Sequence, residues 1–446
     1  MMEVPKHVKK LLTILEKEGF SAHPVGGCVR DGLMGRVPAD WDVCTAAKPE
    51  QMHALFSAAG YRLVETGIRH GTVTVLTEGG PVEVTCFRTD GTYADNRHPD
   101  RVVFVPTLEE DLARRDFTVN AMALAPDGTV IDLYGGRADL AAGLIRCVGD
   151  PDTRFGEDAL RILRALRFAA KLDFQIEPAT AQSVLKNRAL LQNVAPERIF
   201  TELKGLLIGP GAGRVLRAFG PVIFQIIPEL AAQDGFDQKN PNHIHDIWTH
   251  TTMAVDAMAP DPVLRLTMLL HDVGKPAMYF TDDAGVGHFY GHAKKGMEMA
   301  DVILRRLRCD NATRKTVTTY IKFHDIEPPQ TAKSMRRLLA RLGEDAVRRL
   351  IQCWRADSFD RGEAVRLRNY AIIDRSEQIM EQVLAQTMCF SLGDLAVSGD
   401  DILALGVEKG PAVGRILKEL FRLVTEEELP NEPEVLLARA KDIAFL

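Results

Sequence analysis

Two aspartates separated by one residue, Asp40 and Asp42, are the part of this sequence best suited to metal chemistry. They follow a turn at Gly26 and Gly27, and we expect both on a short strand, where alternate side chains share one face. Paired carboxylates repel unless a cation lies between them, and Mg²⁺ binds such oxygens while leaving positions for phosphates. Consecutive glycines before a helix let backbone N–H groups approach a phosphate. The pattern favours metal-assisted nucleotidyl transfer; the alternative is a solvated strand end.

A third carboxylate lies on a predicted β-hairpin. Residues 72–76 and 82–86 alternate and are rich in β-branched side chains, so we expect two strands joined by a turn at Gly79 and Gly80. Glu83 would then lie on the polar face of its strand. It could join the aspartates as a metal ligand or take the proton of an attacking hydroxyl, or it could be a solvated edge residue.

The composition is that of a globular protein with no membrane segment. The chain has 446 residues, enough for two to four domains, and its net charge of -6 argues mildly against a nucleic-acid binder unless local clusters supply the positive charge. Seven cysteines include no Cys-x-x-Cys pair, which favours reduced thiols over disulfides or a zinc knuckle. With no signal-peptide pattern and no run near the ~20 apolar residues of a spanning helix, we expect a cytoplasmic protein.

Helical patterns dominate after the first third of the chain. Residues 157–170 are predicted as one helix, with an apolar stripe beside a row of three arginines, Arg161, Arg164 and Arg167. Guanidinium groups at this spacing suit a triphosphate, although a salt-bridged surface helix is the commoner outcome. Asp158 lies one turn before Arg161, so the two could offer an acceptor and a donor to the edge of a base.

Seven of the twelve histidines fall between residues 243 and 324. The pair His271–Asp272 ends an apolar helix predicted over 263–270. Imidazole and carboxylate groups in this combination suit a metal site. The combination resembles an HD-type phosphohydrolase domain, which implies His250, His271 and Asp272 as ligands. The further candidates are His292, His324 and Asp357.

A basic helical region over residues 305–349 supplies the local positive charge that the net charge conceals. Such clusters can bind RNA phosphates, although most charge runs are solvated faces. The candidates for RNA binding are Arg305, Arg306, Arg336 and Arg337.

Several motifs together resemble the class II tRNA nucleotidyltransferases, the CCA-adding enzymes and bacterial poly(A) polymerases. They are Val-Gly-Gly-Cys-Val-Arg-Asp at 25–31, Asp-Trp-Asp at 40–42, Arg-Arg-Asp-Phe-Thr-Val-Asn-Ala at 114–121 and Glu-Asp-x-x-Arg at 157–161. The resemblance covers essentially the whole chain. It implies an α+β fold, with a polymerase-β-like nucleotidyltransferase head built on a small mixed sheet, followed by an elongated all-α neck, an HD-type body and a tail. The expected boundaries are 1–150 for the head, 151–235 for the neck, 240–360 for the HD-type domain and 361–446 for the tail.

The resemblance also implies a reaction, the template-independent addition of C, C and A to tRNA 3′ ends from CTP and ATP, with release of pyrophosphate. Asp40 and Asp42 would bind Mg²⁺, and Glu83 would complete the catalytic set. Asp158 and Arg161 would read the base. The implied nucleotide-binding residues are Gly27, Arg30, Arg115, Asp116, Asn120, Asp158, Arg161, Arg164 and Arg167. A second divalent metal would bind at His250, His271 and Asp272.

Two alternatives stay open. A poly(A) polymerase or an A-adding enzyme has nearly the same head. A metal-dependent HD phosphohydrolase acting on RNA ends or nucleotides would instead use the head only to bind RNA. The polar segment 88–101, expected to be a mobile surface loop, resembles the flexible loop of enzymes that add the terminal A, which argues against a CC-only enzyme. Residues 132–139 resemble the hinge between head and neck, or form a plain strand–turn–helix join. No protein partner is predicted.

Overall fold

The computed structural model describes residues 3–64, 68, 71–90, 102–386 and 392–445, and the chain divides into two compact units. The first comprises residues 1–231 with 305–309, and the second comprises 232–304 with 310–446. None of the helices in the described ranges is both long and apolar enough to cross a membrane. Every cysteine in these ranges is buried and free of disulfide bonds.

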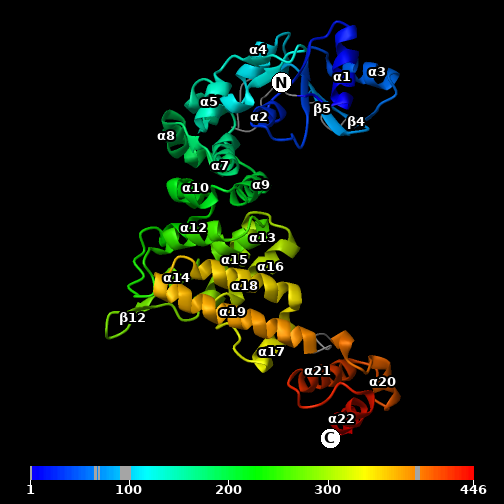
Figure 1. Ribbon diagram of the computed structural model, residues 1–446, viewed down its shortest axis with the longest axis vertical. Helices are drawn as coiled ribbons and strands as arrows, with labels where there is room; N and C mark the ends of the chain where they lie inside the picture. Colours follow the sequence, from blue (N-terminus) through cyan, green and yellow to red (C-terminus); the bar gives the residue numbers. More distant parts are fainter. Residues whose placement is uncertain (1–2, 65–67, 69–70, 91–101, 387–391, 446) are drawn as a thin grey trace. The chain divides into compact units, whose positions relative to one another are not determined.

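A five-stranded mixed sheet with the order β1–β2–β5–β4–β3 is the base of the first unit (Figure 1). In this sheet only β2 and β5 run parallel. Valines at alternate positions of β4 and β5 join one apolar core with side chains of α1 and α3. Glu83 lies between two of these valines and is therefore on the opposite face, as predicted. The elements are β1 (Ala22–Pro24), β2 (Asp42–Thr45), β3 (Arg62–Val64), β4 (Thr72–Thr77), β5 (Gly80–Cys86), α1 (Lys6–Lys17) and α3 (Pro49–Ala58).

The strand that carries the aspartates is shorter than predicted. It begins at Asp42, and Asp40 lies in the bend before it, so the expectation of two aspartates on one strand is wrong. Asp42 is opposite Glu83 in the parallel register, which would place Pro81 opposite Asp40. The pairing of β2 with β5 begins at Asp42.

Helices and short strand pairs complete the first unit. Apolar residues of α7 at helical spacing, among them Leu163 and Leu166, are buried, and this helix packs against α9. The helices are α2 (Gly27–Leu33), α4 (Leu108–Ala113), α5 (Gly136–Ala142), α6 (Pro151–Glu157), α7 (Leu160–Leu172), α8 (Pro178–Asn187), α9 (Pro196–Leu207), α10 (Ala212–Ala218) and α11 (Gly220–Ile226). The strand pairs are β6 (Arg88–Asp90) with β7 (Val102–Phe104), β8 (Met122–Leu124) with β9 (Val130–Asp132), and β10 (Leu144–Ile145) with β11 (Gln175–Ile176).

Two further expectations are corrected here. The helix predicted over 157–170 is broken, because α6 ends at Glu157 and α7 begins at Leu160. Asp158 has extended dihedrals, φ -133° and ψ 103°, and its Oδ1 accepts a hydrogen bond from Leu160 N at 3.0 Å. Aspartate favours such capping positions over helix interiors. The segment 88–101 begins with strand β6 rather than a loop, and residues 91–101 lie outside the described part of the chain.

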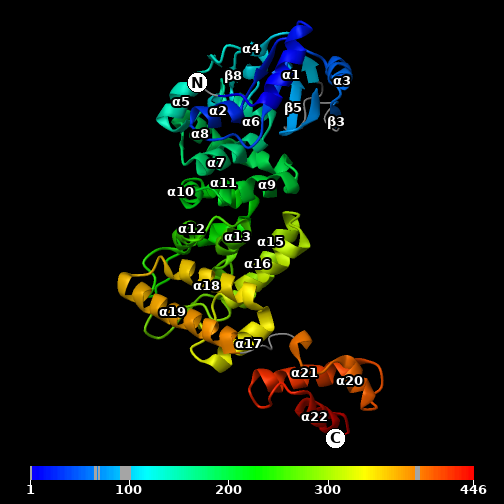
Figure 2. The same cartoon turned by 45° about the vertical axis from the view of Figure 1, so that its right-hand side comes forward.

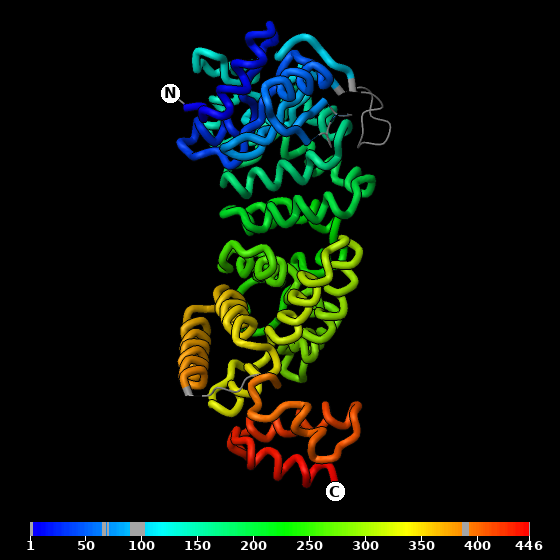
Figure 3. The backbone as a smooth tube through the Cα atoms, turned by 90° about the vertical axis from the view of Figure 1, so that its right-hand side faces the viewer, coloured from blue at the N-terminus to red at the C-terminus, as the bar shows by residue number. Residues whose placement is uncertain are grey.

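The second unit is helical, apart from a small hairpin of β12 (Phe280–Thr281) and β13 (Gly287–His288). Helices α18 and α19 lie side by side (Figure 2). The last three helices form a small core of their own (Figure 3). The helices are α12 (Ile247–Ala257), α13 (Pro262–Leu270), α14 (Lys275–Met278), α15 (His292–Arg306), α16 (Asn311–Phe323), α17 (Ala332–Leu342), α18 (Glu344–Ser358), α19 (Glu363–Gln386), α20 (Gly399–Ala404), α21 (Pro411–Thr425) and α22 (Pro433–Phe445).

Candidate functional sites

Three carboxylates gather at the start of β2 in the first unit. Asp42 and Glu83 are register partners across the parallel β2–β5 pair, and Asp40 lies in the bend before β2. Burial, together with the negative charges of Asp40 and Glu83, raises the pKa of Asp42 to about 6. A carboxylate that is both desolvated and beside like charges needs a cation. These residues can supply oxygen ligands to a divalent ion, although their carboxylate oxygens do not all lie within 4.8 Å of one another in this structure.

The glycine turn before α2 brings a guanidinium close to these carboxylates. Gly26 has φ +74°, which favours glycine, and a Cβ there would lie 2.9 Å from Arg115 Nη1. Buried Asp111 holds Arg115 in place, since Arg115 Nη2 donates to its Oδ2 at 3.0 Å. The positive charge of Arg115 also opposes the rise in the pKa of Asp42. Arg115 is thus positioned beside both the turn and the carboxylates.

A chain of four polar side chains connects α2 with α7. Arg30 Nη1 donates to Asn120 Oδ1 at 2.6 Å, and Asn120 Nδ2 donates to Asp116 Oδ1 at 3.2 Å. Arg164 Nε then donates to Asp116 Oδ2 at 2.8 Å. Although burial raises the pKa of Asp116, Arg164 and Asn120 hold it below its usual value. The structure therefore brings four of the predicted nucleotide-binding residues into one network of hydrogen bonds, in which Asp116 is ionised.

The arginine row of α7 is paired with acids and with an aromatic ring. Arg30, Arg164 and Arg167 lie around the ring of Phe168, with guanidinium-to-centroid distances of 5.4, 5.3 and 4.5 Å. Arg167 Nε also donates to Glu202 Oε2 at 2.6 Å. Charge repulsion along the helix is thereby relieved. Neither Phe168 nor Glu202 carries a local sequence signal, because only the packing of α7 against α9 reveals their role.

The two predicted base readers have protein partners in this structure. Asp158 Oδ2 lies 3.2 Å from Arg198 Nη2. Buried Arg161 donates to Glu157 Oε2 at 2.5 Å and to the carbonyl of Arg114 at 3.0 Å. A base could reach the Asp158 carboxylate only by sharing it with Arg198 or replacing that ion pair.

The arginines predicted to bind RNA also have acidic neighbours. Arg306 pairs with Glu229 at 2.7 Å, and Arg337 pairs with Glu426 at 2.6 Å. Arg336 is buried, donates to the carbonyl of Thr425 at 3.2 Å, and thereby connects α17 to the end of α21. Arg305 lies in the last turn of α15. Contact of these residues with RNA stays a prediction.

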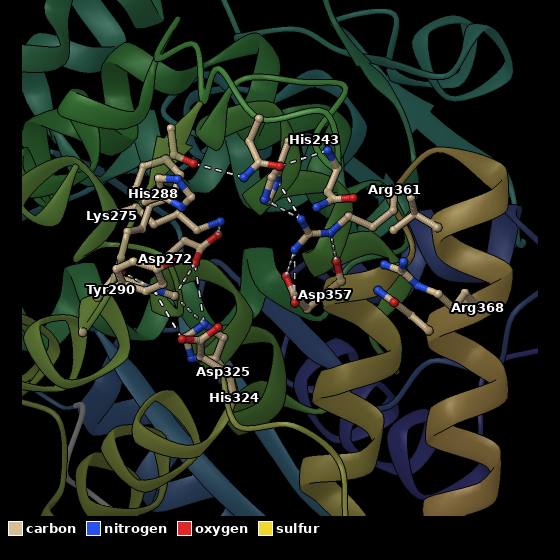
Figure 4. A pocket seen from close by; sticks show the side chains of 18 residues that line it. His243, Asp272, Lys275, His288, Tyr290, His324, Asp325, Asp357, Arg361 and Arg368 are labelled. Atoms are coloured by element: carbon tan, nitrogen blue, oxygen red, sulfur yellow. Dashed lines mark hydrogen bonds and ion pairs between the residues drawn. The ribbon is translucent and has the colours of Figure 1, made fainter. Parts of the chain in front are cut away.

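In the second unit, buried histidines and carboxylates form two clusters that share Asp272 (Figure 4). Asp272 Oδ2 faces His250 and His271, at 3.4 and 3.2 Å. Its Oδ1 faces His292 and His324, at 3.4 and 3.6 Å. The first cluster consists of His250, His271, Asp272 and Asp357, and the second consists of Asp272, His292 and His324. Within the described residues, three or more ligand atoms of His, Cys, Asp or Glu lie within 4.8 Å of one another only in these two clusters.

The hydrogen bonds of the imidazoles fix their orientation. In His271, His292 and His324, Nδ1 lies 2.7, 3.0 and 2.6 Å from the backbone carbonyl three residues earlier, so Nδ1 carries the proton in the neutral ring. Each Nε2 then presents a lone pair to the cluster. Yet the Nε2 atoms of His271 and His250 are 3.3 Å apart, and those of His292 and His324 are 3.2 Å apart. Facing lone pairs repel unless a cation lies between them, which is the usual arrangement of metal-binding histidines.

Asp272 itself is a buried carboxylate with too few partners. Neither oxygen has a hydrogen-bond partner, although Lys275 Nζ lies 2.7 Å from Oδ2 as an ion pair. Burial opposes ionisation, but the charges of His271 and Lys275 keep the pKa of Asp272 well below its usual value. A buried anion needs compensating positive charge. This donor set of imidazole and carboxylate groups fits divalent transition metals such as Mn²⁺, Fe²⁺ or Zn²⁺.

One residue near the cluster was not singled out from the sequence. Asp360 is buried, and its Oδ2 lies 3.6 Å from His250 Nδ1. It lies in the turn directly after α18, three residues beyond Asp357. A carboxylate behind a metal-binding imidazole orients the ring and raises its basicity.

Comparisons with known proteins agree over the full chain. The poly(A) polymerase head domain matches residues 22–146, the RNA and SrmB-binding site of polymerase A matches 173–233, and tRNA nucleotidyltransferase domain 2 matches 290–440. The CCA-adding enzyme of Limosilactobacillus fermentum is 34% identical over 98% of this chain and 96% of its own length. That of Ligilactobacillus salivarius is 48% identical over 48% of this chain and 53% of its own.

A solved structure extends this similarity to the fold. The Bacillus stearothermophilus CCA-adding enzyme in complex with CTP superposes with a TM-score of 0.71 at 29% identity, covering 98% of this chain and 96% of that one. The polymerase-β-like head with its mixed sheet and the helical body are therefore shared. The chain belongs to the CCA-adding enzyme family and is a template-independent tRNA nucleotidyltransferase.

Proposed function

We propose that the three carboxylates of the head carry out the addition of C, C and A to tRNA 3′ ends. The observation that supports this is the register of Asp42 against Glu83, with Asp40 beside them. Asp40 and Asp42 would hold Mg²⁺, which neutralises charge on the triphosphate and on departing pyrophosphate when bound. The tRNA 3′ hydroxyl attacks the α-phosphorus of CTP or ATP, and Glu83 accepts its proton.

The remaining polar residues of the head would hold the nucleotide. Arg115 and Arg164 are positioned by Asp111 and Asp116, which leaves the edges of their guanidinium groups for phosphate oxygens. Gly27, Arg30 and Arg167 would complete the triphosphate contacts. Asp116 and Asn120 would meet the ribose.

Base selection would use Asp158 and Arg161. The carboxylate only accepts hydrogen bonds and the guanidinium only donates. CTP and ATP each offer an amino donor next to a ring-nitrogen acceptor, whereas UTP and GTP offer the reverse. Because Asp158 is paired with Arg198 in this structure, nucleotide binding would exchange one partner of that carboxylate for the amino group.

Sequencing the products distinguishes this function from its alternatives. Purified enzyme is incubated with all four NTPs and either a tRNA lacking its 3′ end or the same tRNA ending in CC. We expect CCA on the first tRNA and a single A on the second. A tail of many adenosines, or addition of A alone to the first tRNA, would contradict CCA addition.

We also propose that the second unit contains an HD-type metal centre with phosphohydrolase activity. The observation that favours this is the convergence of four buried imidazoles on a shared carboxylate that has no hydrogen-bond partner. Divalent ions there would activate water and polarise a phosphoryl group when bound. Backbone carbonyls fix the tautomers of the imidazoles, and Lys275 and Arg361 would contact phosphate oxygens.

Hydrolysis of a chromogenic phosphodiester by protein loaded with Mn²⁺ tests this second activity. We expect Asp272→Ala to abolish it and Asp42→Ala to leave it unchanged. Equal hydrolysis by the wild type and Asp272→Ala would show that the activity comes from elsewhere.

A further inference from the structure

The Asp272 clusters open onto a pocket of about 390 Å³ in the second unit (Figure 4). Its walls carry three cationic side chains, Lys275, Arg361 and Arg368. Arg361 is held by Asp357 at 3.3 Å. Arg368 projects from α19, is exposed, and has no ion-pair or hydrogen-bond partner among the described residues. Lys275 also adjoins the clusters, 2.7 Å from Asp272 Oδ2, and cations beside a metal centre suit a phosphate group.

The hairpin beside this pocket has two aromatic layers. The inner layer is buried or half-buried, with Tyr279 packing against Phe236 and Phe289 at centroid distances of 5.1 and 5.4 Å. The outer layer consists of Phe280, His288 and Tyr290. Because side chains alternate along an extended chain, residues 279 and 289 face inward while 280, 288 and 290 face outward.

The outer layer is a compact cluster of three rings, in which Phe280 and Tyr290 also meet, with centroids 5.7 Å apart and planes tilted by 48°. The His288 ring lies 5.3 Å from Phe280 and 5.4 Å from Tyr290, with interplanar angles of 29° and 20°. Asp282 fixes the His288 ring through a 2.8 Å hydrogen bond to Nε2. Phe280 is 46% exposed and Tyr290 is 71% exposed, so the inner layer, not the outer one, holds the hairpin in place. Exposed stacked rings are platforms on which nucleobases stack.

The platform and the phosphate-binding wall belong to one site. His288 and Tyr290 line the same pocket as Asp272, Lys275 and Arg361. Tyr290 also precedes the cluster residue His292 by two positions. A ligand that reaches the metal centre with its phosphate therefore passes beside the exposed rings.

We propose that the exposed ring of Tyr290, supported by His288 and Phe280, is a base-binding platform and that this pocket takes a nucleoside phosphate. The proposal rests on the metal centre proposed above and names the class of its substrate. The phosphate lies against the Asp272 clusters and the cationic wall, and the base stacks on the exposed rings.

Calorimetric titration of the Mn²⁺-loaded full-length protein with AMP and with ribose 5-phosphate separates the two parts of the site. We expect AMP to bind more tightly than ribose 5-phosphate. Tyr290→Ala should weaken AMP binding roughly 5- to 150-fold, which is the range for loss of one base–aromatic stack. It should leave ribose 5-phosphate binding unchanged. Tyr290→Phe should retain AMP binding, and Phe445→Ala, which removes an exposed ring outside the pocket, should change neither ligand.

The outcomes separate the platform from the metal centre. Uptake of metal with equal affinity for both ligands overturns the platform and leaves the metal centre standing. If the protein takes up no metal at the Asp272 clusters but still prefers AMP, and Tyr290→Ala removes that preference, the platform is supported and the metal centre is overturned. Absence of binding by both ligands overturns the nucleoside phosphate site, and metal uptake then decides separately whether the metal centre stands. Titration with a short oligoadenylate carrying a terminal phosphate then shows whether the nucleotide is free or an RNA end.

Discussion

The shared position of Asp272 predicts how many metal ions the second unit binds. Each carboxylate oxygen faces one histidine pair, so the wild type should bind two divalent ions at these clusters. Asp272→Ala removes a ligand from both clusters and should bind neither ion tightly. His324→Ala removes a ligand only from the second cluster, so one ion should remain at His250, His271 and Asp357.

The magnitude follows from mass action. An ion at 100 times its Kd stabilises the folded state by about 2.7 kcal/mol. For a unit spanning residues 232–304 and 310–446, about 1 kcal/mol changes Tm by roughly 2–4 °C. Chelation should therefore lower the Tm of His324→Ala by roughly 5–11 °C, that of the wild type by about twice as much, and that of Asp272→Ala hardly at all.

Co²⁺ titration followed by visible absorption measures the count, because imidazole ligation changes that spectrum strongly. The Tm of each variant is then compared with and without chelator. Because both values come from the same protein, their difference reports the stabilisation by bound metal and not the effect of the substitution itself. Asp42→Ala is the matched control, since it changes only the carboxylate site of the head and should retain both ions. Two ions on Asp272→Ala, or none on His324→Ala, would refute a shared carboxylate.

Three further predictions concern Asp42, Asp158 and Arg336. Asp42→Asn should lower nucleotide incorporation by more than ~100-fold, because substituting a residue that only supports a metal ligand already costs roughly 10- to 100-fold. A filter-binding assay should give unchanged tRNA affinity. Normal incorporation by this variant would remove Asp42 from the site. Asp158→Ala should lower the use of CTP and ATP and relax the rejection of UTP and GTP, because each unpaired buried group costs about 1–3 kcal/mol. Single-nucleotide incorporation kinetics measure this. If incorporation of all four nucleotides slows by one common factor, Asp158 has a structural role. Arg336→Ala should lower the free energy of unfolding by about 1.5–3 kcal/mol, because the buried guanidinium of Arg336 contacts the Thr425 carbonyl and Glu427. If stability is unchanged and the salt dependence of tRNA binding becomes flatter, Arg336 instead contacts a phosphate.

The sequence by itself determined the elements whose residues repeat with a clear period. Alternation in 72–86 predicted the hairpin of β4 and β5 and placed Glu83 on the face away from the valines. The apolar run before His271 predicted α13. These predictions succeeded because the period of a strand or helix decides which side chains are buried, and that information is local.

Local patterns failed where a partner far along the chain decides the outcome. Strand β2 begins only at Asp42, where its pairing with Glu83 of the neighbouring strand starts. The helix around Asp158 breaks because the side chain caps Leu160 and the carboxylate also meets Arg198, forty residues away. Propensity and period carry no information about such partners.

The sites themselves were decided by the tertiary structure. The sequence supplied the residue types, but Arg164 meets Asp116 across 48 positions, and His250 meets Asp357 across 107. The aromatic platform likewise depends on which side of the hairpin its inner layer packs. Loop closure over such separations costs conformational entropy that only the whole packed unit repays. The types of residue could therefore be read from the chain, whereas their convergence could be established only from the folded units.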